Sequence, residues 1–571
     1  MYRNSAIVNI KLILKGGFSL DDNKLKIIPL GGIEEVGKNM TIFECNNDII
    51  AIDCGSIFPH EDLLGVDLVI PDVTYLIENK EKLRGFVFTH GHEDHIGAVP
   101  YILKQVQAPI YGSKLTLALI DIKLKEHRMS DVSTTLIKPN DVLQLGCFKI
   151  TFVNVNHSIP GAFALIIDSP AGKVVVSGDF KIDFTPIRGE VTDLATLAQA
   201  GKEGIMCLLC ESTNVEHEGS TISESKIKET FHELFETAQG RIIIAMFASN
   251  VHRIQMACDA AMRFGRKICF VGRSMVNVTR VAMEINELEL PEDWIVEDEF
   301  IDNYRDDQLL IITTGSQGEA MAGLTRMAFG EHRKVRIRPT DMVILSSSPI
   351  PGNEKNTSRV LDQLYRCGAN VVYNSLAKVH ASGHACKEEL KIMHTLCKPK
   401  YFIPIHGEYR MLWQHAELAE SMGTLPENII IPEAGQVIEM TQDSVALGAT
   451  VPNGALMVDG LGIGDVGNVV LRDRKHLSQD GIIIVSLALD RDKGVLVSGP
   501  EIVSRGFIYI RDNDDILDGL ADYARNIVLS YGKIDNQAFN DLRNRLKNDL
   551  RRIIYGKIKR NPMILPIIMN V

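Results

Sequence analysis

Residues 90–95 have the sequence HGHEDH and directly follow the apolar run 85–89. If that run is a strand, three imidazoles and two carboxylates lie on the loop at its end. Imidazole together with carboxylate is the ligand set that zinc and its neighbours prefer, and a hydrolytic metal site also needs an open coordination position. A histidine-rich solvated loop is the alternative, which this spacing disfavours. The sequence therefore predicts a strand that leads into a hydrolytic metal site.

The spacing within this loop suggests how its side chains are directed. Alternate residues of an extended segment point to the same side. We therefore expect His90, His92 and Asp94 to converge on a common point, whereas His95 breaks the alternation and points elsewhere. One loop could thus serve two metal ions.

Length, composition and net charge indicate a multidomain globular protein and disfavour one that coats nucleic acid. A chain of 571 residues is long enough for several domains, and 45% hydrophobic with 23% charged residues is ordinary for a globular protein. The net charge of −12 argues against a protein that coats nucleic acid non-specifically. It does not exclude a nucleic-acid enzyme, because a metal centre and a local basic groove can bind a polyanion within an acidic surface.

The cysteines and apolar segments indicate a cytoplasmic protein. Ten cysteines are scattered without the spacing of a disulfide scaffold, which suits a reducing compartment. The lone CxxC, Cys207 and Cys210, lies in a strand-like run and favours buried structural thiols over redox chemistry. No stretch approaches transmembrane length, and the N-terminus lacks a convincing signal-peptide cleavage region. We expect no membrane partner.

The hydrophobic pattern changes along the chain. From Leu25 short strand-like runs alternate with glycine turns, which indicates a mixed α/β sandwich. Near residue 220 strands begin to alternate with helices, the first of them capped by Ser223, and this pattern is typical of a parallel sheet flanked by helices. The expected strands of that sheet are 242–246, 268–271, 309–313, 342–345 and 370–373.

Histidines that suit a metal site resume only after this parallel-sheet region. A site begun before residue 180 and completed after 380 suggests an inserted domain, and the alternative is that the late histidines belong to unrelated surfaces. The expected divisions are an N-terminal extension 1–24, a metal-binding sandwich 25–220, an inserted domain 221–377, the rest of the sandwich 378–446, a linker 447–460 and a C-terminal domain 461–571.

Two further polar residues follow strand-like runs. His157 ends the run 150–156, and Asp179 follows 174–176. Alone, each would more often be a turn residue. Beside the histidine loop they are predicted metal ligands, and an aspartate between two cations can bridge them.

Several motifs together resemble known families. His90-x-His92-x-Asp94-His95, His157 and Asp179 resemble the metallo-β-lactamase superfamily. The inserted domain, with the segments 211–214, 382–385 and 404–407, resembles its β-CASP branch of nucleases. Segments 31–39, 247–250, 315–319 and 562–566 are similar to bacterial ribonuclease J, and the similarity covers about residues 25–571.

This resemblance implies a fold and a ligand set. The fold is a metallo-β-lactamase αββα sandwich with an inserted Rossmann-like β-CASP domain and a small C-terminal α/β domain. Two divalent ions are implied, for which zinc suits the ligands, with manganese or magnesium as alternatives for the active form. One ion is assigned to His90, His92 and His157, the other to Asp94, His95 and His406, and Asp179 is shared.

The resemblance also implies an activity. The implied enzyme is a 5′-to-3′ exoribonuclease that prefers 5′-monophosphorylated single-stranded RNA, with added endonuclease activity, in mRNA decay and rRNA maturation. A hydroxide shared by the ions attacks the phosphodiester and leaves 5′-phosphate and 3′-hydroxyl ends. His384 matches the proposed general acid, and Glu211 matches an acidic residue that supports the site.

Substrate contacts and assembly are implied in the same way. The segment His380, Ala381, Ser382, Gly383, His384 and Ala385 is expected to cradle the 5′-phosphate, and Ala248, Ser249 and Asn250 are expected to contact RNA. Phe247 could stack a base, although burial is the more common role of such a residue. The C-terminal domain resembles a region used for dimer or tetramer assembly, so we expect a homo-oligomer, with a paralogous ribonuclease J or an RNA-degradation complex as further partners.

Three alternatives stay open at this point. A β-CASP nuclease acting on DNA has the same ligand set. A hydrolase of small esters would need neither the inserted domain nor His384. An inactive scaffold of an RNA-degradation complex would not need an intact ligand set.

Overall fold

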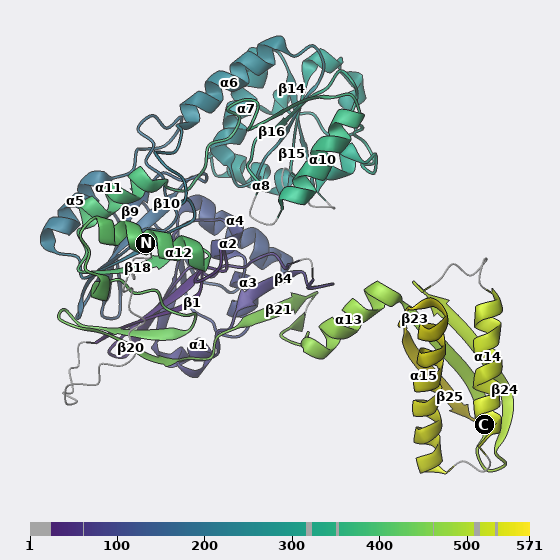
Figure 1. The fold of residues 1–571 in the computed structure, drawn as a ribbon. Coiled ribbons are helices and arrows are strands. Elements are labelled where there is room, and N and C mark those ends of the chain that lie inside the picture. The colour runs from purple at the N-terminus through teal and green to yellow at the C-terminus, as the bar shows by residue number, and fades with distance from the viewer. Residues whose placement is uncertain are drawn as a thin grey trace, which may run out of the picture. The chain divides into compact units, whose positions relative to one another are not determined.

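The computed structural model describes residues 24–60, 62–315, 322–349, 353–460, 462–507, 514–531 and 535–571. The expected N-terminal extension, apart from Lys24, and residues 316–319 of one family motif therefore lie outside the described residues. The chain forms two compact units (Figure 1). The main unit comprises Met1–Ile57 and Val69–Leu456, and the C-terminal unit comprises Phe58–Leu68 and Met457–Val571.

Two mixed sheets form the first part of the main unit. The larger sheet has the order β20 (Val445–Thr450), β19 (Gln436–Met440), β1 (Leu25–Gly31), β2 (Met40–Cys45), β3 (Asp48–Ile52), β5 (Leu83–Val87), β6 (Ile110–Gly112) and β7 (Thr134–Leu136). The second has the order β18 (Tyr401–Ile405), β12 (Cys207–Glu211), β11 (Gly172–Val176), β10 (Ala162–Ser169), β9 (Phe148–Val155) and β8 (Val142–Leu145).

The two sheets pack face to face, and helices cover the outside. Phe43 and Ile50 of the larger sheet belong to one buried cluster with Phe163 and Leu209 of the second. The other face of the second sheet is covered by α5 (Leu194–Glu203), α11 (Lys387–Cys397) and α12 (Tyr409–Ser421) (Figure 1). The remaining helices of this part are α1 (Thr74–Glu78), α2 (Glu93–Ile96), α3 (Val99–Leu103) and α4 (Lys114–Glu126), and the short strand β4 spans Leu68–Pro71. This arrangement is the αββα sandwich that the sequence resemblance implies.

The middle of the chain forms a separate parallel sheet. Its order is β14 (Lys267–Val271), β15 (Leu309–Thr313), β13 (Ile242–Ala245), β16 (Met342–Leu345) and β17 (Asn370–Tyr373), and every pairing is parallel. Strands buried on both faces are continuous apolar runs, as in 242–245, where all four residues are buried. The five expected strands are thus confirmed within one residue at either end.

Helices flank this parallel sheet on both faces. One face packs against α9 (Gly323–Ala328) and α10 (Glu354–Arg366). The other helices of this region are α6 (Glu224–Thr237), α7 (Val251–Arg263) and α8 (Arg273–Glu284). The Ser223 hydroxyl accepts a hydrogen bond from the Ser225 backbone N–H and so caps α6, as its position before the apolar stripe predicts.

One strand pairing shows how the chain returns from this insertion. β12 precedes the parallel sheet and β18 follows it, yet the two strands pair in parallel with Cys207 opposite Tyr401 and Glu211 opposite Ile405. β11 pairs in parallel with the other side of β12. The carboxyl ends of β11, β12 and β18 therefore lie side by side at the same end of the second sheet, although the three strands are far apart in sequence.

The C-terminal unit has its own core. β24 (Val495–Arg505), β23 (Ile482–Asp490) and β25 (Met563–Asn570) form a sheet, and two helices cover one face of it (Figure 1). α14 (Asp514–Leu529) packs there through Leu520 and Ile527, and α15 (Asn536–Ile558) through Leu542, Leu546, Leu550 and Ile554. The other elements of this part are β21 (Ala455–Asp459), β22 (Gly462–Ile463) and α13 (Asn468–Asp480). Within the described residues, no helix combines the length and hydrophobicity that crossing a membrane requires.

The expected linker contains regular structure, and the two cysteines of the CxxC motif are buried. The stretch 447–460, expected as a linker, contains the end of β20 and all of β21. Cys207 and Cys210 are fully buried on β12, and burial raises the pKa of both thiols, which disfavours the reactive thiolate. They are structural thiols, as expected.

Candidate metal centre

Strand ends present most of the predicted ligands. His90 and His92 follow β5, His157 follows β9, Asp179 follows β11, and His406 follows β18. The strands supply buried apolar residues that fix the backbone, and the polar side chains begin where the sheet ends. The site therefore lies at the carboxyl ends of strands from both sheets, a common place for functional residues on a rigid scaffold.

Three imidazoles form the first ligand group. His92 Nδ1 lies 3.1 Å from His90 Nε2 and 3.0 Å from His157 Nε2. Burial lowers the pKa of all three rings, well below its ordinary value for His90 and His157 and to about 4 for His92. The rings are therefore neutral at pH 7, and their lone pairs are available to a metal ion.

The second group combines carboxylates and imidazoles. Asp94 Oδ2 lies 3.3 Å from His406 Nε2 and 3.6 Å from His95 Nε2, and Asp179 Oδ2 lies 3.2 Å from His95 Nε2. The same Asp179 oxygen is 3.7 Å from His90 Nε2 in the first group. Asp179 thus places one carboxylate oxygen within 4 Å of ligand nitrogens of both groups, as a shared ligand must.

This grouping corrects the expectation drawn from alternation. Asp94 lies with His95, and not with His90 and His92. The reason is local: the extended backbone ends at His92, and α2 begins at Glu93. On a helix, neighbouring side chains are about 100° apart, so Asp94 and His95 can both reach the second group.

The buried atoms of the second group fit a bound cation. Asp179 Oδ2 and His406 Nε2 are buried, and within the described part of the chain neither has a contact with hydrogen-bond geometry, although each lies within 3.3 Å of a side chain of the same group. Buried polar atoms are almost always hydrogen-bonded, so two such atoms in one cluster of possible ligands call for another partner. A divalent cation satisfies both, and the neighbouring imidazoles and carboxylates complete its ligand set.

Electrostatics supports the same interpretation. Burial lowers the pKa of His95 and His406, but the charges of Asp179 and Asp94 outweigh it, raising the pKa of His95 well above its ordinary value and that of His406 to about 10. The carboxylates in turn have lowered pKa values because of these two histidines, despite their burial. The cluster therefore holds two carboxylates that attract positive charge, which is the requirement of a metal site.

Hydrogen bonds at the Nδ1 atoms orient two of the predicted histidine ligands. His157 Nδ1–H donates to the Gly383 carbonyl over 2.7 Å, and His95 Nδ1–H donates to Asp53 over 2.8 Å. Each bond leaves the Nε2 atom of the ring facing its ligand group. Asp53 also accepts hydrogen bonds from the Thr89 backbone N–H and hydroxyl, both at 2.8 Å.

The sequence interpretation did not single out Asp53, which the structure places in hydrogen-bond contact with the predicted ligand His95. Asp53 directly follows β3, as Asp179 follows β11 at a short distance, and it has a left-handed backbone with φ of 60°. A strand-end aspartate is a weak signal by itself, since most such residues only form turns. Asp53 lies beside the histidine loop because β3 and β5 pair in parallel, and the sequence alone does not show this pairing.

His384 and Glu211 form a pair at the edge of the ligand groups. His384 Nδ1–H donates to Glu211 Oε2 over 2.6 Å, and Glu211 Oε1 accepts from the Phe180 backbone N–H over 2.8 Å. Burial lowers the pKa of His384, but Glu211 outweighs it, so the net shift is upward. The His384 side chain keeps 23% of its surface exposed, so it is accessible beside the buried ligands.

The segment around His384 is fixed by the loop that follows β12. Asn214 Nδ2 donates to Ser382 Oγ over 2.8 Å and to the His384 carbonyl over 2.9 Å. Thr221 Oγ1 donates to the same carbonyl over 3.0 Å. A side chain at position 383 would come within 2.6 Å of the His157 ring, so only glycine fits there. The predicted phosphate-binding segment thus directly adjoins the ligands.

The second predicted RNA-contacting segment lies at the start of α7. Asn250 is buried, and its side chain caps α7 by accepting from the Arg253 backbone N–H over 3.2 Å. Ala248, Ser249 and Phe247 are half-buried. The Asn250 side chain therefore has a structural use, and Ala248 and Ser249 remain accessible to a ligand.

Comparison with known protein families agrees with this geometry. Four domain families match the chain: a "Beta-lactamase superfamily domain" at residues 58–201, a "Ribonuclease J, beta-CASP domain" at 239–364, a "Zn-dependent metallo-hydrolase RNA specificity domain" at 369–432 and a "Ribonuclease J C-terminal domain" at 469–571. Together they cover both parts of the sandwich, the insertion and the C-terminal unit.

Similar proteins match over nearly the full length. Ribonuclease J2 of Bacillus subtilis is 40% identical over 96% of this chain and 99% of its own length. Ribonuclease J 1 of Streptococcus pyogenes is 41% identical over 97% and 99% of the two chains, and ribonuclease J of Thermus thermophilus is 41% identical over 96% and 95%. A solved structure of a protein of unknown function from Enterococcus faecalis is 17% identical, with a TM-score of 0.54 over 73% of this chain and all of that one, and shows the fold alone.

Proposed function

The chain belongs to the ribonuclease J family and is a metal-dependent ribonuclease, and on this premise we propose how its residues act on RNA. We propose that it degrades single-stranded RNA from a 5′-monophosphorylated end and also cuts internally, leaving 5′-phosphate and 3′-hydroxyl ends. The observation that carries this proposal is Asp179, which is buried between the two ligand groups with one oxygen lacking a hydrogen bond.

Seven side chains would hold two divalent ions. His90, His92 and His157 would bind one ion, and Asp94, His95 and His406 the other, with Asp179 shared. When bound, such ions polarise phosphoryl oxygens and activate water. Zinc suits a set rich in imidazole, and manganese or magnesium are the alternatives. The chain's own part is to orient the imidazoles, through the bonds that His157 donates to Gly383 and His95 donates to Asp53. Burial also keeps His90, His92 and His157 neutral by lowering their pKa values.

His384 is the proposed general acid. Its Nδ1–H bond to Glu211 leaves Nε2 as the atom that can carry a proton to the leaving 3′ oxygen. Glu211 favours the protonated ring and fixes its orientation. Glu211 is itself held by the Phe180 N–H, so it acts on the reaction through His384 and not by contact with RNA.

The segment 380–385 is the proposed binding site for the 5′-phosphate. Gly383 allows the backbone to approach the ligand groups, and the hydroxyl of Ser382 lies in the same turn. Backbone N–H groups and hydroxyls of such turns bind anions well. A phosphate held here would be a fixed distance from the metal centre, which explains stepwise cleavage from the 5′ end. Ala248, Ser249 and Asn250 are proposed to contact the RNA further along.

The first prediction tests the activity itself. We expect a 5′-monophosphorylated RNA to be degraded faster than the same RNA with a 5′-hydroxyl or 5′-triphosphate, and chelation to abolish degradation of all three. Metal removal leaves Asp94 and Asp179 without the cations they face. The measurement is product release from end-labelled RNAs before and after dialysis against a chelator, with activity restored by zinc, manganese or magnesium in separate reactions.

A matched single-stranded DNA is the control for substrate class. Equal rates on RNA and DNA would assign the chain to a general nuclease. Full activity in a metal-free sample would overturn the metal-dependent mechanism.

We also propose that the C-terminal unit joins copies of the chain. One face of its sheet is covered by helices, whereas the other exposes apolar side chains: Val495 51%, Val497 57%, Leu565 38%, Ile567 42% and Met569 52%. A patch of this kind on a monomer usually marks an interface. The expected assembly is a dimer or tetramer, and a paralogous ribonuclease J or an RNA-degradation complex remains the proposed further partner.

The second prediction follows from this face. Ile567→Asp should lower the mass of the assembly, because a charge replaces an apolar side chain at a buried contact. The measurement is light scattering after gel filtration at several concentrations. Asn548→Asp, at an exposed position of α15, adds the same charge elsewhere in the unit and should leave the mass unchanged. A monomeric natural protein would refute the assembly proposal.

The proposed enzyme has three domains and a cytoplasmic location. We propose the metallo-β-lactamase domain at 25–220 and 378–446, the β-CASP domain at 221–377 and the C-terminal domain at 461–571, after a connection at 447–460. We propose a cytoplasmic location because single-stranded RNA of the proposed kind is found there.

A further inference from the structure

Arg253 of α7 is fully buried, yet it lies outside the seven ligands and the proposed RNA contacts. Its Nη2 donates to Glu224 Oε1 over 2.5 Å, and its Nε donates to Glu224 Oε2 over 3.2 Å. Its Nη1 donates to His380 Nδ1 over 2.8 Å, and Nη2 donates to the Ala381 carbonyl over 2.9 Å. One guanidinium therefore joins the inserted parallel-sheet region to the start of the proposed phosphate-binding segment.

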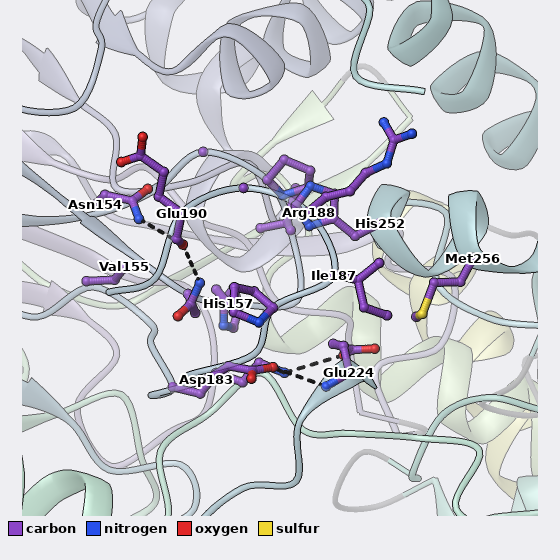
Figure 2. Close-up of a pocket in the computed structure, with 17 residues that line it drawn as sticks. Asn154, Val155, His157, Asp183, Ile187, Arg188, Glu190, Glu224, His252 and Met256 are labelled. Atoms are coloured by element: carbon purple, nitrogen blue, oxygen red, sulfur yellow. Dashed lines mark hydrogen bonds and ion pairs between the residues drawn. The ribbon is translucent and has the colours of Figure 1, made fainter. Parts of the chain in front are cut away.

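Glu224 balances the buried charge of Arg253. Burial raises the pKa of Glu224, but Arg253 and Lys181 outweigh it and bring the pKa to about 2. Lys181 Nζ lies 3.4 Å from Glu224 and 3.8 Å from Asp183, and these groups line a cavity of about 60 Å³ that His157 also lines (Figure 2). The pair is thus ionised and buried, and Glu224 lines the same cavity as the predicted ligand His157.

The contact with Arg253 determines the form of His380. A guanidinium has only donors, so His380 Nδ1 must accept and the ring proton must lie on Nε2. Burial and then the charge of Arg253 lower the pKa of His380 to about 3, although Glu224 and the Ser346 carbonyl act in the opposite direction. His380 is therefore a neutral ring of one tautomer, and it adds no positive charge to the segment.

The segment is held from two sides. Arg253 binds the Ala381 carbonyl, and Ser346 Oγ donates to the Val379 carbonyl over 2.6 Å, both from the inserted region. Asn214 binds Ser382 and His384 from the loop after β12. Arg253 therefore fixes both the side chain of His380 and the backbone carbonyl of Ala381.

We propose that Arg253, neutralised by Glu224, is a positioning residue that holds His380 and Ala381 in the geometry that recognises the RNA 5′-phosphate. This inference rests on the proposed end recognition. It assigns the preference for a monophosphorylated end partly to a buried side chain that does not itself touch RNA.

The test uses Arg253→Met and the double variant Arg253→Met/Glu224→Met in the full chain. Replacing both Arg253 and Glu224 by apolar residues of similar size avoids leaving either charge without the other, and Lys181 keeps Asp183, 3.8 Å away, as its counter-ion. The double variant should therefore fold. In it we expect the ratio of kcat/KM for 5′-monophosphorylated over 5′-hydroxyl RNA to fall roughly 10- to 100-fold, the range for loss of a charge-assisted hydrogen bond. Hydrolysis of bis(p-nitrophenyl) phosphate, which has no RNA end, should be unchanged.

The control is another buried ion pair of the same region. Arg241 and Asp341 are fully buried and joined by two hydrogen bonds of 2.7 and 2.9 Å. Arg241 also donates to the Arg336 carbonyl, and within the described part of the chain its side chain forms no hydrogen bond with residues 379–385. Arg241→Met/Asp341→Met should keep the natural end preference.

The outcomes separate this inference from the proposed function. A double variant at Arg253 and Glu224 with the natural end preference, or with equal losses on RNA ends and on bis(p-nitrophenyl) phosphate, overturns the positioning role. A natural enzyme that does not distinguish the two RNA ends overturns the proposed end recognition, and the inference with it.

Discussion

Asp179→Asn should remove bound metal and slow RNA cleavage by at least about 10³-fold, which corresponds to roughly 4 kcal/mol of lost transition-state stabilisation. Asp179 adjoins both ligand groups, with Oδ2 3.2 Å from His95 Nε2 and 3.7 Å from His90 Nε2. An amide has no negative charge to share between two cations. It would also place an NH₂ donor or a weaker acceptor where a carboxylate oxygen now faces the ligands.

Metal content and rate should be measured together for this variant. Elemental analysis after gel filtration gives the number of ions per chain, and single-turnover cleavage of a 5′-monophosphorylated RNA gives the rate. Asp183→Asn is the matched control, because Asp183 is buried four residues later and binds the Thr185 and Glu224 backbone N–H groups instead of ligands. It should retain its metal. An Asp179→Asn enzyme with two bound ions and normal turnover would end the shared-ligand assignment.

His384→Ala should keep its metal content and still cleave RNA 10²- to 10⁴-fold more slowly, the range typical of a lost general acid. His384 belongs to neither of the two ligand groups that hold the ions in our assignment. Among the residues that the structure describes, its side chain hydrogen-bonds only to Glu211, so its removal leaves the bonds that orient the other rings intact.

A companion variant separates protonation from orientation. Glu211→Gln keeps an acceptor for His384 Nδ1–H but removes the charge that raises the pKa of His384, so we expect a smaller loss of roughly 10- to 100-fold, as for other groups that orient a functional residue. An RNA with a 3′-thio leaving group needs no acid, and on it His384→Ala should approach the natural rate. If both variants cleave the ordinary RNA normally, His384 has no part in proton transfer.

Much of the site could be predicted because its signals are local. His90, His92, His157 and Asp179 each follow an apolar run, and an apolar run bounded by polar residues shows where a strand ends. The parallel sheet of the insertion was equally clear, because its strands are continuous runs of buried residues. The error at Asp94 was also local in origin: alternation holds only while the chain is extended, and α2 begins one residue earlier.

The two residues that the sequence interpretation did not single out, Asp53 and Arg253, each bind a partner that is distant in sequence. Asp53 acts on Thr89, 36 residues away, and Arg253 acts on His380, 127 residues away. Neither has a sequence neighbourhood that distinguishes it from an ordinary turn or helix residue. Only the pairing of β3 with β5, and the packing of α7 against the segment 379–381, gives them their roles.

The sequence by itself determined the chemistry of this protein: which side chains can bind metal, which runs form strands and where an independent sheet interrupts them. Hydrophobic periodicity and ligand type are properties of short segments, so no fold is needed to recognise them. The family resemblance already implied the grouping of the ligands, whereas only the tertiary structure showed the pairing of Glu211 with His384, the support of His95 by Asp53 and the link from Arg253 to His380. Those depend on the register between strands such as β12 and β18, which is fixed by packing between residues almost two hundred positions apart.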